Sequence, residues 1–143
     1  MNKRDKTKKR RYRVDEPKLP KNKNIKFSFE FYDTGESKYC ISKWKEHQIL
    51  ETLKRLKDIN QKTFYEMSTG GRTYHFHPVC WESTVEKKGF SNLKVNQLEA
   101  FQFGLLGVNG QKARVFGGYA DNTFYIVWFD LEHKIWPTFK KHT

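Results

Sequence analysis

From residue 25 onward, apolar and polar side chains alternate with the two-residue period of a strand that buries one face. The apolar members of this series are Ile25, Phe27, Phe29 and Phe31. The Asp33-Thr34-Gly35 sequence then has the composition of a turn, and the pattern changes to helical spacing. We expect a helix from Lys43 to Asn60, N-capped by Ser42, with an apolar stripe that packs on a sheet. The stripe comprises Ile49, Leu50, Leu53 and Leu56.

A second, shorter helix is predicted next, because Thr63 and Glu66 have the spacing of a capping box and Gly70-Gly71 can end the helix. The segment from residue 72 to residue 98 has no single period. Its first part, Arg72 to His77, alternates like a strand, whereas the remainder has the composition of loops. We therefore expect one short strand followed by a long irregular insert.

Another strand is predicted from Glu99 to Gly107. Within it Phe101, Phe103 and Leu105 occupy alternate positions, which is typical of a strand with one face in the core. The Asn109-Gly110 pair that follows favours a tight turn, so this strand is expected to pair antiparallel with the next one.

The strongest strand signal is a pair of β-branched and aromatic runs that flank Asp121-Asn122, two residues able to take the positive φ angles of a hairpin turn. With a two-residue turn, Arg114 is expected opposite Phe129 and Val115 opposite Trp128. One face of the ribbon would then carry Val115, Tyr119, Phe124, Ile126 and Trp128, and the other Arg114, Phe116, Tyr125, Val127 and Phe129.

The predicted order is a strand, two helices, an irregular insert and a three-stranded antiparallel meander. This order indicates an α+β fold with the helices packed on one face of the sheet. A length of 143 residues fits one domain, which we expect to run from residue 25 to residue 143. Residues 1 to 24 are strongly basic and nearly lack large apolar side chains, which predicts a disordered arm.

The chain carries 28 Lys and Arg against 16 Asp and Glu, a formal net charge of +12 with a pI near 9.7. Such a balance favours a polyanionic partner, namely nucleic acid, the ribosome or an acidic protein. The basic arm would either keep the protein soluble or add sequence-independent phosphate contacts. The longest apolar run, Phe124 to Phe129, is too short to cross a bilayer, and two cysteines do not make a disulfide framework. We interpret the protein as cytoplasmic, with no membrane partner.

Several side chains could carry chemistry. Arg114 is either a surface strand residue with a buried stem or a charged fork held among aromatic residues. His75 and His77, together with Arg72, could border a phosphate site. The same two histidines and Cys80 could instead bind a metal, but they lack the paired spacing of a dedicated site, so no metal or cofactor is expected.

Two local features accompany the element order. An arginine stands early in the penultimate strand, in Ala113-Arg114-Val115-Phe116-Gly117, and the last strand leads into His133-Lys134-Ile135-Trp136-Pro137. Together these features resemble the RelE/ParE toxin superfamily of bacterial toxin–antitoxin systems. The chain is most similar to uncharacterised members associated with phages and mobile elements. The resemblance extends over residues 25 to 137 in topology and residues 113 to 137 in local sequence. It implies a small, basic, metal-free endoribonuclease that cuts messenger RNA, often on the ribosome, and is neutralised by an antitoxin protein.

The resemblance also implies roles for individual residues. By position, Arg114 would hold the scissile phosphate and His133 would be the acid or base. Lys134 would add positive electrostatic potential. A metal-free ribonuclease needs these functions because it must deprotonate a 2′-hydroxyl, stabilise extra charge on phosphorus and protonate the leaving 5′-oxygen.

Four further residues would contact the RNA by the same resemblance. Lys54 or Arg55 would add positive charge, and Tyr125 or Trp136 would stack a base. From the helical pattern alone, Lys54 and Arg55 are instead typical of a solvated face. Two other functions stay open: a non-catalytic nucleic-acid or ribosome-binding protein, and a gyrase-type inhibitor that acts by protein contacts.

Overall fold

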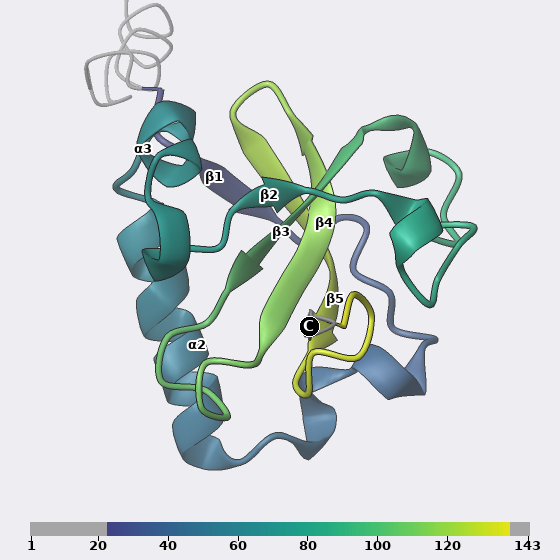
Figure 1. Cartoon of the computed structure of the whole chain (residues 1–143), viewed down its shortest axis with the longest axis horizontal. Helices are drawn as coiled ribbons and strands as arrows, with labels where there is room; N and C mark the ends of the chain where they lie inside the picture. The colour runs from purple at the N-terminus through teal and green to yellow at the C-terminus, as the bar shows by residue number, and fades with distance from the viewer. Residues whose placement is uncertain (1–22, 138–143) are drawn as a thin grey trace, which may run out of the picture.

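The computed structural model describes residues 23 to 137, so nearly all of the predicted basic arm lies outside the described residues. The predicted α+β element order is confirmed (Figure 1). The main elements are β1 (Lys26–Ser28), α2 (Glu46–Ile59), α3 (Phe64–Ser68), β2 (His77–Pro78), β3 (Glu99–Gly104), β4 (Arg114–Ala120) and β5 (Thr123–Asp130). Short 3-10 turns lie at Ser37–Tyr39, Ile41–Lys43, Gly71–Thr73, Trp81–Ser83 and Val95–Gln97.

The sheet has five strands in the order β1-β5-β4-β3-β2, so β4 is the central strand. The meander of β3, β4 and β5 is antiparallel, as predicted, and β2 pairs antiparallel with β3. β1 pairs in parallel with β5. The first strand is shorter than its alternation predicts, because it ends at Ser28. Phe29, the next apolar position, is 55% exposed.

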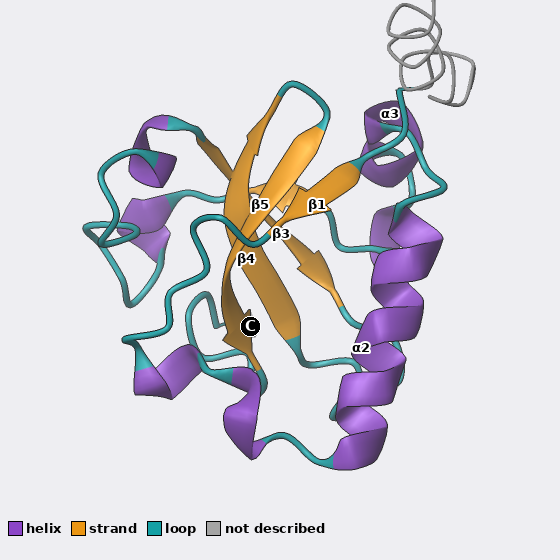
Figure 2. Ribbon diagram, turned by 180° about the vertical axis from the view of Figure 1, so that it is seen from behind, coloured by secondary structure: helices purple, strands orange, loops and turns teal. Residues whose placement is uncertain are grey.

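The helices and the insert lie on opposite sides of the sheet. α2 and α3 lie along one side, and the irregular segment between β2 and β3 lies along the other (Figure 1, Figure 2). A hydrophobic cluster fills each side: Phe103 and Phe124 belong to the helix-side cluster, and Phe116 and Trp128 to the insert-side cluster. Both faces of the sheet are therefore buried, which explains the near-continuous apolar run of β5.

α2 begins later than predicted and buries a different face. Its buried residues are Gln48, Thr52, Arg55, Leu56 and Ile59, while Leu50 and Leu53 are 52% and 57% exposed. Thr52 Oγ1 donates to the Gln48 carbonyl, so this polar residue can be buried at little cost. The predicted stripe is thus wrong at Leu50 and Leu53. No helix within residues 23 to 137 is long and apolar enough to span a bilayer.

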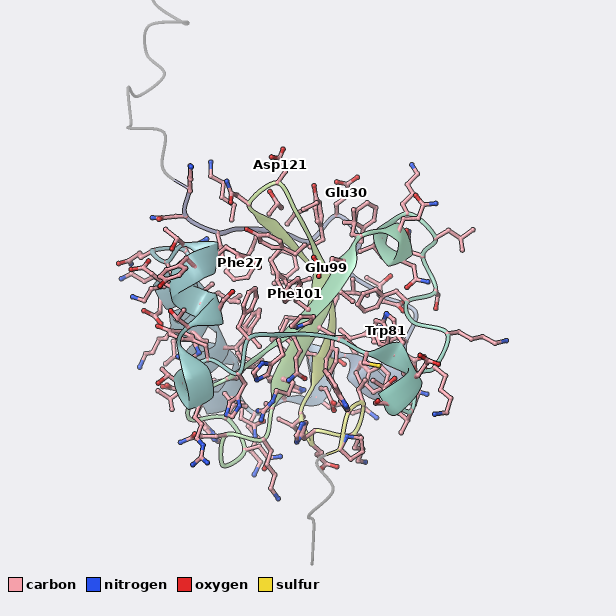
Figure 3. All side chains as sticks on the ribbon, turned by 45° about the horizontal axis from the view of Figure 1, so that its top comes forward. Phe27, Glu30, Trp81, Glu99, Phe101 and Asp121 are labelled. Atoms are coloured by element: carbon pink, nitrogen blue, oxygen red, sulfur yellow. The ribbon has the colours of Figure 1, made fainter. Side chains whose placement is uncertain are left out.

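The predicted capping box and hairpin turn are both present. Thr63 Oγ1 accepts from the Glu66 amide and the Glu66 carboxylate accepts from the Thr63 amide, which fixes the start of α3. Asp121 and Asn122 have φ angles of 55° and 61°, as a two-residue turn between β4 and β5 requires (Figure 3 labels Asp121 at the tip).

The predicted hairpin register is confirmed from the Ala120–Thr123 pair to the Gly117–Ile126 pair, and beyond that point it is wrong by one residue. A β-bulge between Phe116 and Gly117 leaves Val127 of β5 without a cross-strand partner. Val127 and Trp128 consequently both face the insert side, and Phe129 faces the helix side. The observed pairs are Arg114 with Asp130, Val115 with Phe129 and Phe116 with Trp128.

The predicted strand from Arg72 to His77 is largely absent. Arg72 lies in the 3-10 turn Gly71–Thr73, and only His77 and Pro78 pair with β3. The reason is local: His75 has a φ angle of 51°, which interrupts an extended chain. The irregular insert that follows is confirmed.

Candidate functional site

A cleft of about 920 Å³ lies where β4 begins, on the insert side of the sheet. Its walls come from β3, β4, the segment before β2, the insert and the chain that follows β5. Half of the residues proposed from sequence as site residues meet in it: His75, His77, Arg114, His133 and Trp136.

Arg114 lines this cleft and is only 7% exposed. Its Nη1 donates to the carbonyls of Gln111 at 2.7 Å and Ala113 at 3.1 Å. Its Nε is buried and has no hydrogen-bond partner among the described residues. Burial lowers the pKa of Arg114, while the charge of Asp130 opposes that shift. A guanidinium that is buried and incompletely paired is costly unless an anion completes it.

His133 is brought to the cleft by a turn that Asp130 organises. Asp130 is 2% exposed, and its two carboxylate oxygens accept from the amides of Lys134 at 3.0 Å and Ile135 at 2.7 Å. His133 itself has a φ angle of 59°, an uncommon conformation for a residue other than glycine. Burial and the positive charge of Arg114 lower the pKa of His133, and Asp130 acts in the opposite direction.

His75 enters the cleft from the other side, next to β3. The Gly104 amide donates to the Tyr74 carbonyl at 2.7 Å, which holds this segment against the end of β3. Gly104 leaves the space that the ring occupies, because an added Cβ would lie 3.0 Å from His75 Cδ2 and 3.3 Å from Arg114 Nη1. Burial lowers the pKa of His75, and its cationic neighbours lower it further, Arg114 most among them.

Sequence reasoning missed Gln102, which lines the cleft from β3. Gln102 is 6% exposed, and its Oε1 has no hydrogen-bond partner among the described residues. The signal was available, because Gln102 is a polar residue between Phe101 and Phe103 in an otherwise apolar strand. The insert adds further lining residues that no periodicity could reveal: Glu82, Ser83, Thr84, Val85 and Lys87.

Arg55 is not on the solvated helix face that its sequence pattern predicts, for it is 6% exposed. Its Nε donates to the Gly104 carbonyl at 3.0 Å, and Nη2 donates to the Thr73 carbonyl. The guanidinium stacks on the Tyr74 ring, 4.3 Å from its centroid, and lies 3.8 Å from an oxygen of Asp58. These contacts join α2 to the sheet, so Arg55 has a structural position behind the cleft.

The remaining candidates lie away from the cleft. Lys54 is exposed and 3.2 Å from Glu51, and Lys134 is exposed and 3.0 Å from Glu132. Arg72 is also exposed, in its 3-10 turn. Tyr125 packs against the Phe31 ring at a centroid distance of 5.2 Å and is not available as a stacking platform in the cleft.

No group of three His, Cys, Asp or Glu side chains within residues 23 to 137 is arranged to hold a metal ion. The rings of His75 and His77 are 6.5 Å apart, and Cys80 is an exposed free thiol outside the cleft lining. The chain matches no protein-family model, no curated protein and no solved structure. The chemistry of the cleft itself is therefore the basis for assigning a function.

Proposed function

We propose that this protein is a ribonuclease of the RelE/ParE type that cleaves messenger RNA on the ribosome with its own side chains as catalysts. The observation that carries the proposal is Arg114, a buried guanidinium whose Nε lacks a partner within residues 23 to 137, at a cleft lined by three histidines. A neutralising antitoxin belongs to the proposal on the resemblance alone.

The charge pattern of the cleft supports a phosphodiester ligand. An arginine fork binds phosphate oxygens with charge-assisted hydrogen bonds, and Arg114 still has donors for them after its two carbonyl contacts. The Asp130 carboxylate accepts from two backbone amides and forms no ion pair with the fork among the described residues. A phosphodiester would supply the missing acceptor and offset the buried positive charge.

The histidines support cleavage in addition to binding. RNA cleavage without a metal needs a base for the 2′-hydroxyl and an acid for the 5′-oxygen, and imidazole can serve in either role near neutral pH. His133 adjoins Arg114 closely enough for their charges to interact. Trp136 offers an aromatic surface at the rim on which a base can stack.

A cleavage assay tests this function. Purified full-length protein is incubated with ribosomes and a defined message, and the new 5′ ends are mapped by primer extension. We expect Arg114→Ala and His133→Ala each to lower the cleavage rate about 100-fold or more and to relieve growth arrest on expression. The matched control is Lys112→Ala, which removes one exposed positive charge two residues before Arg114.

Other outcomes identify the competing functions. RNA or ribosome binding without cleavage would make the protein a non-catalytic binding module. Inhibition of purified gyrase, with no effect of Arg114→Ala on RNA, would indicate the gyrase-type alternative. Either result contradicts the ribonuclease proposal.

A further inference from the structure

The sheet topology places two histidines on opposite flanks of Arg114. β4 is central, with β5 on one side and β3 followed by β2 on the other. His133 follows β5, and its turn is fixed by the last residue of that strand, Asp130. His75 precedes β2 and lies against Gly104, the β3 residue that pairs with Arg114. A group bound to the guanidinium would thus have one imidazole on each side.

This arrangement matches the geometry of phosphodiester transesterification. The attacking 2′-oxygen and the leaving 5′-oxygen lie on opposite sides of phosphorus in an in-line displacement, so the base and the acid must approach from opposite sides. Both imidazoles are held by a backbone with positive φ, 51° at His75 and 59° at His133. Such conformations are costly and concentrate at functional sites.

The charged groups around the two rings differ. The charges that lower the pKa of His75 come from Arg114 in β4, from Arg55 in α2 and from the other two cleft histidines. His133 has Arg114 on one side and the Asp130 carboxylate on the other. The insert adds Glu82 and Lys87, of opposite charge, to the same cleft.

A bound phosphodiester would offset the charge of Arg114 at both rings. The remaining charges that shift the pKa of His75 would all favour the neutral imidazole, whereas His133 would retain Asp130, which favours the imidazolium. Two titratable groups with environments that differ in this way take different roles in acid–base catalysis.

We propose that His75 is the general base and His133 the general acid of the cleft, an assignment that rests on the proposed ribonuclease function. His75 removes the proton of the 2′-hydroxyl as the 2′-oxygen forms a bond to phosphorus. The bond from phosphorus to the 5′-oxygen breaks, and His133 gives its proton to that oxygen. The products are a 2′,3′-cyclic phosphate and a free 5′-hydroxyl. His75 ends protonated and His133 neutral, and exchange with water restores both.

A change of leaving group separates the two roles. The substrates are an RNA oligonucleotide and the same oligonucleotide with sulfur in place of the 5′-oxygen at the cleavage site, since a thiolate leaves without an acid. Full-length wild type, His75→Gln and His133→Gln are compared, with His47→Gln, at an exposed histidine of α2 outside the cleft lining, as the matched control. We expect His133→Gln to slow the oxygen ester about 100-fold and the sulfur ester less than about tenfold. His75→Gln should slow both esters about 100-fold.

The outcomes are separable from those of the proposed function. Rescue of His75→Gln, instead of His133→Gln, by the sulfur ester overturns the assignment, as does His75→Gln cleaving both esters at the wild-type rate. Wild type that cleaves neither ester, with ribosomes present, overturns the ribonuclease function itself. Circular dichroism spectra and melting temperatures close to those of wild type are required of each variant. If His75→Gln fails this requirement, His75→Asn replaces it in the same comparison.

Discussion

Two buried arginines, Arg55 and Arg114, lie on opposite sides of the same glycine. They are almost equally exposed, at 6% and 7%. The Gly104 carbonyl accepts a hydrogen bond from Arg55. A Cβ added to Gly104 would lie 3.3 Å from Arg114 Nη1. Arg55 has two carbonyl acceptors, an aromatic ring and a nearby carboxylate. Arg114 has two carbonyl acceptors and an Nε with no partner in the described part of the chain.

The difference separates a structural arginine from a functional one. Burial alone does not distinguish them, because both guanidinium groups lose hydration and have a lowered pKa for that reason. What distinguishes them is the remaining hydrogen-bonding capacity of Arg114 and the histidine-lined cleft beside it. The contacts of Arg55 connect α2 to the sheet, while Arg114 lines a cleft with three histidines.

The largest expected effect is at Arg114. Arg114→Ala should lower RNA cleavage about 100- to 1,000-fold, because it removes the donors that stabilise charge on the phosphorane. The melting temperature should change little or rise, since an incompletely paired buried charge is lost. Arg114→Lys should restore only part of the activity, because an ammonium cannot form the two parallel bonds of a guanidinium. A large fall in stability in both variants would contradict the distinction from Arg55.

The next effect is on stability, at Arg55. Arg55→Ala removes the donors of the Gly104 and Thr73 carbonyls and the cation that stacks on Tyr74. We expect the free energy of unfolding to fall by about 3 kcal/mol, the scale for breaking a buried charged network. Urea denaturation measures the change, and Lys54→Ala, at the exposed neighbouring position, is the control. Equal stability of the two variants would show that Arg55 has no structural role.

The sequence was sufficient to predict the order of elements because each has a local cause. The capping box at Thr63, the Asp121-Asn122 turn and the alternation around Phe103 are all determined by neighbouring residues. The register and the face of α2 depend on tertiary packing instead. At Gly117 an added Cβ would collide with the Tyr125 carbonyl, a close approach at the bulge that a period of two residues cannot reveal.

The site was partly predictable for the same reason. Arg114 and His133 are close in the hairpin, so their meeting follows from the strand pairing even with a register error of one residue. The insert residues reach the cleft through long-range contacts that have no sequence signal, whereas Gln102 has one in its polar position between Phe101 and Phe103. Arg55 and Lys54 show that the sequence pattern does not predict which basic residue is buried. The two are adjacent in the sequence, yet Arg55 is buried and Lys54 is exposed.

A smaller effect is expected from the glycine between the two arginines. Gly104→Ala would place a methyl group against both His75 and Arg114, so the neighbouring side chains must shift by a few tenths of an ångström. We expect RNA cleavage to fall about tenfold, since small displacements of catalytic groups have large effects. The control is Gly35→Ala, whose added Cβ would make only an ordinary contact, 3.7 Å from Asp33 Oδ1. Full activity of Gly104→Ala would mean that the geometry of the cleft is less critical than we propose.

The smallest effect is a dependence of stability on pH, which we expect from the cleft histidines beside Arg114 and not from the surroundings of Arg55. The pKa values of His75 and His133 lie below their ordinary value of 6.5 in the folded protein. Between the folded and unfolded pKa values the unfolded chain binds more protons, so stability decreases as pH falls through about 6.5 and levels off below the folded values. Calorimetric melting temperatures from pH 8 to pH 5 should therefore decline.

Inorganic phosphate should reduce the decline, because an anion at Arg114 raises the pKa of both histidines. A variant with both His75→Gln and His133→Gln should lose most of this slope and most of its response to phosphate. An unchanged slope in that double variant would place the titrating groups outside the cleft.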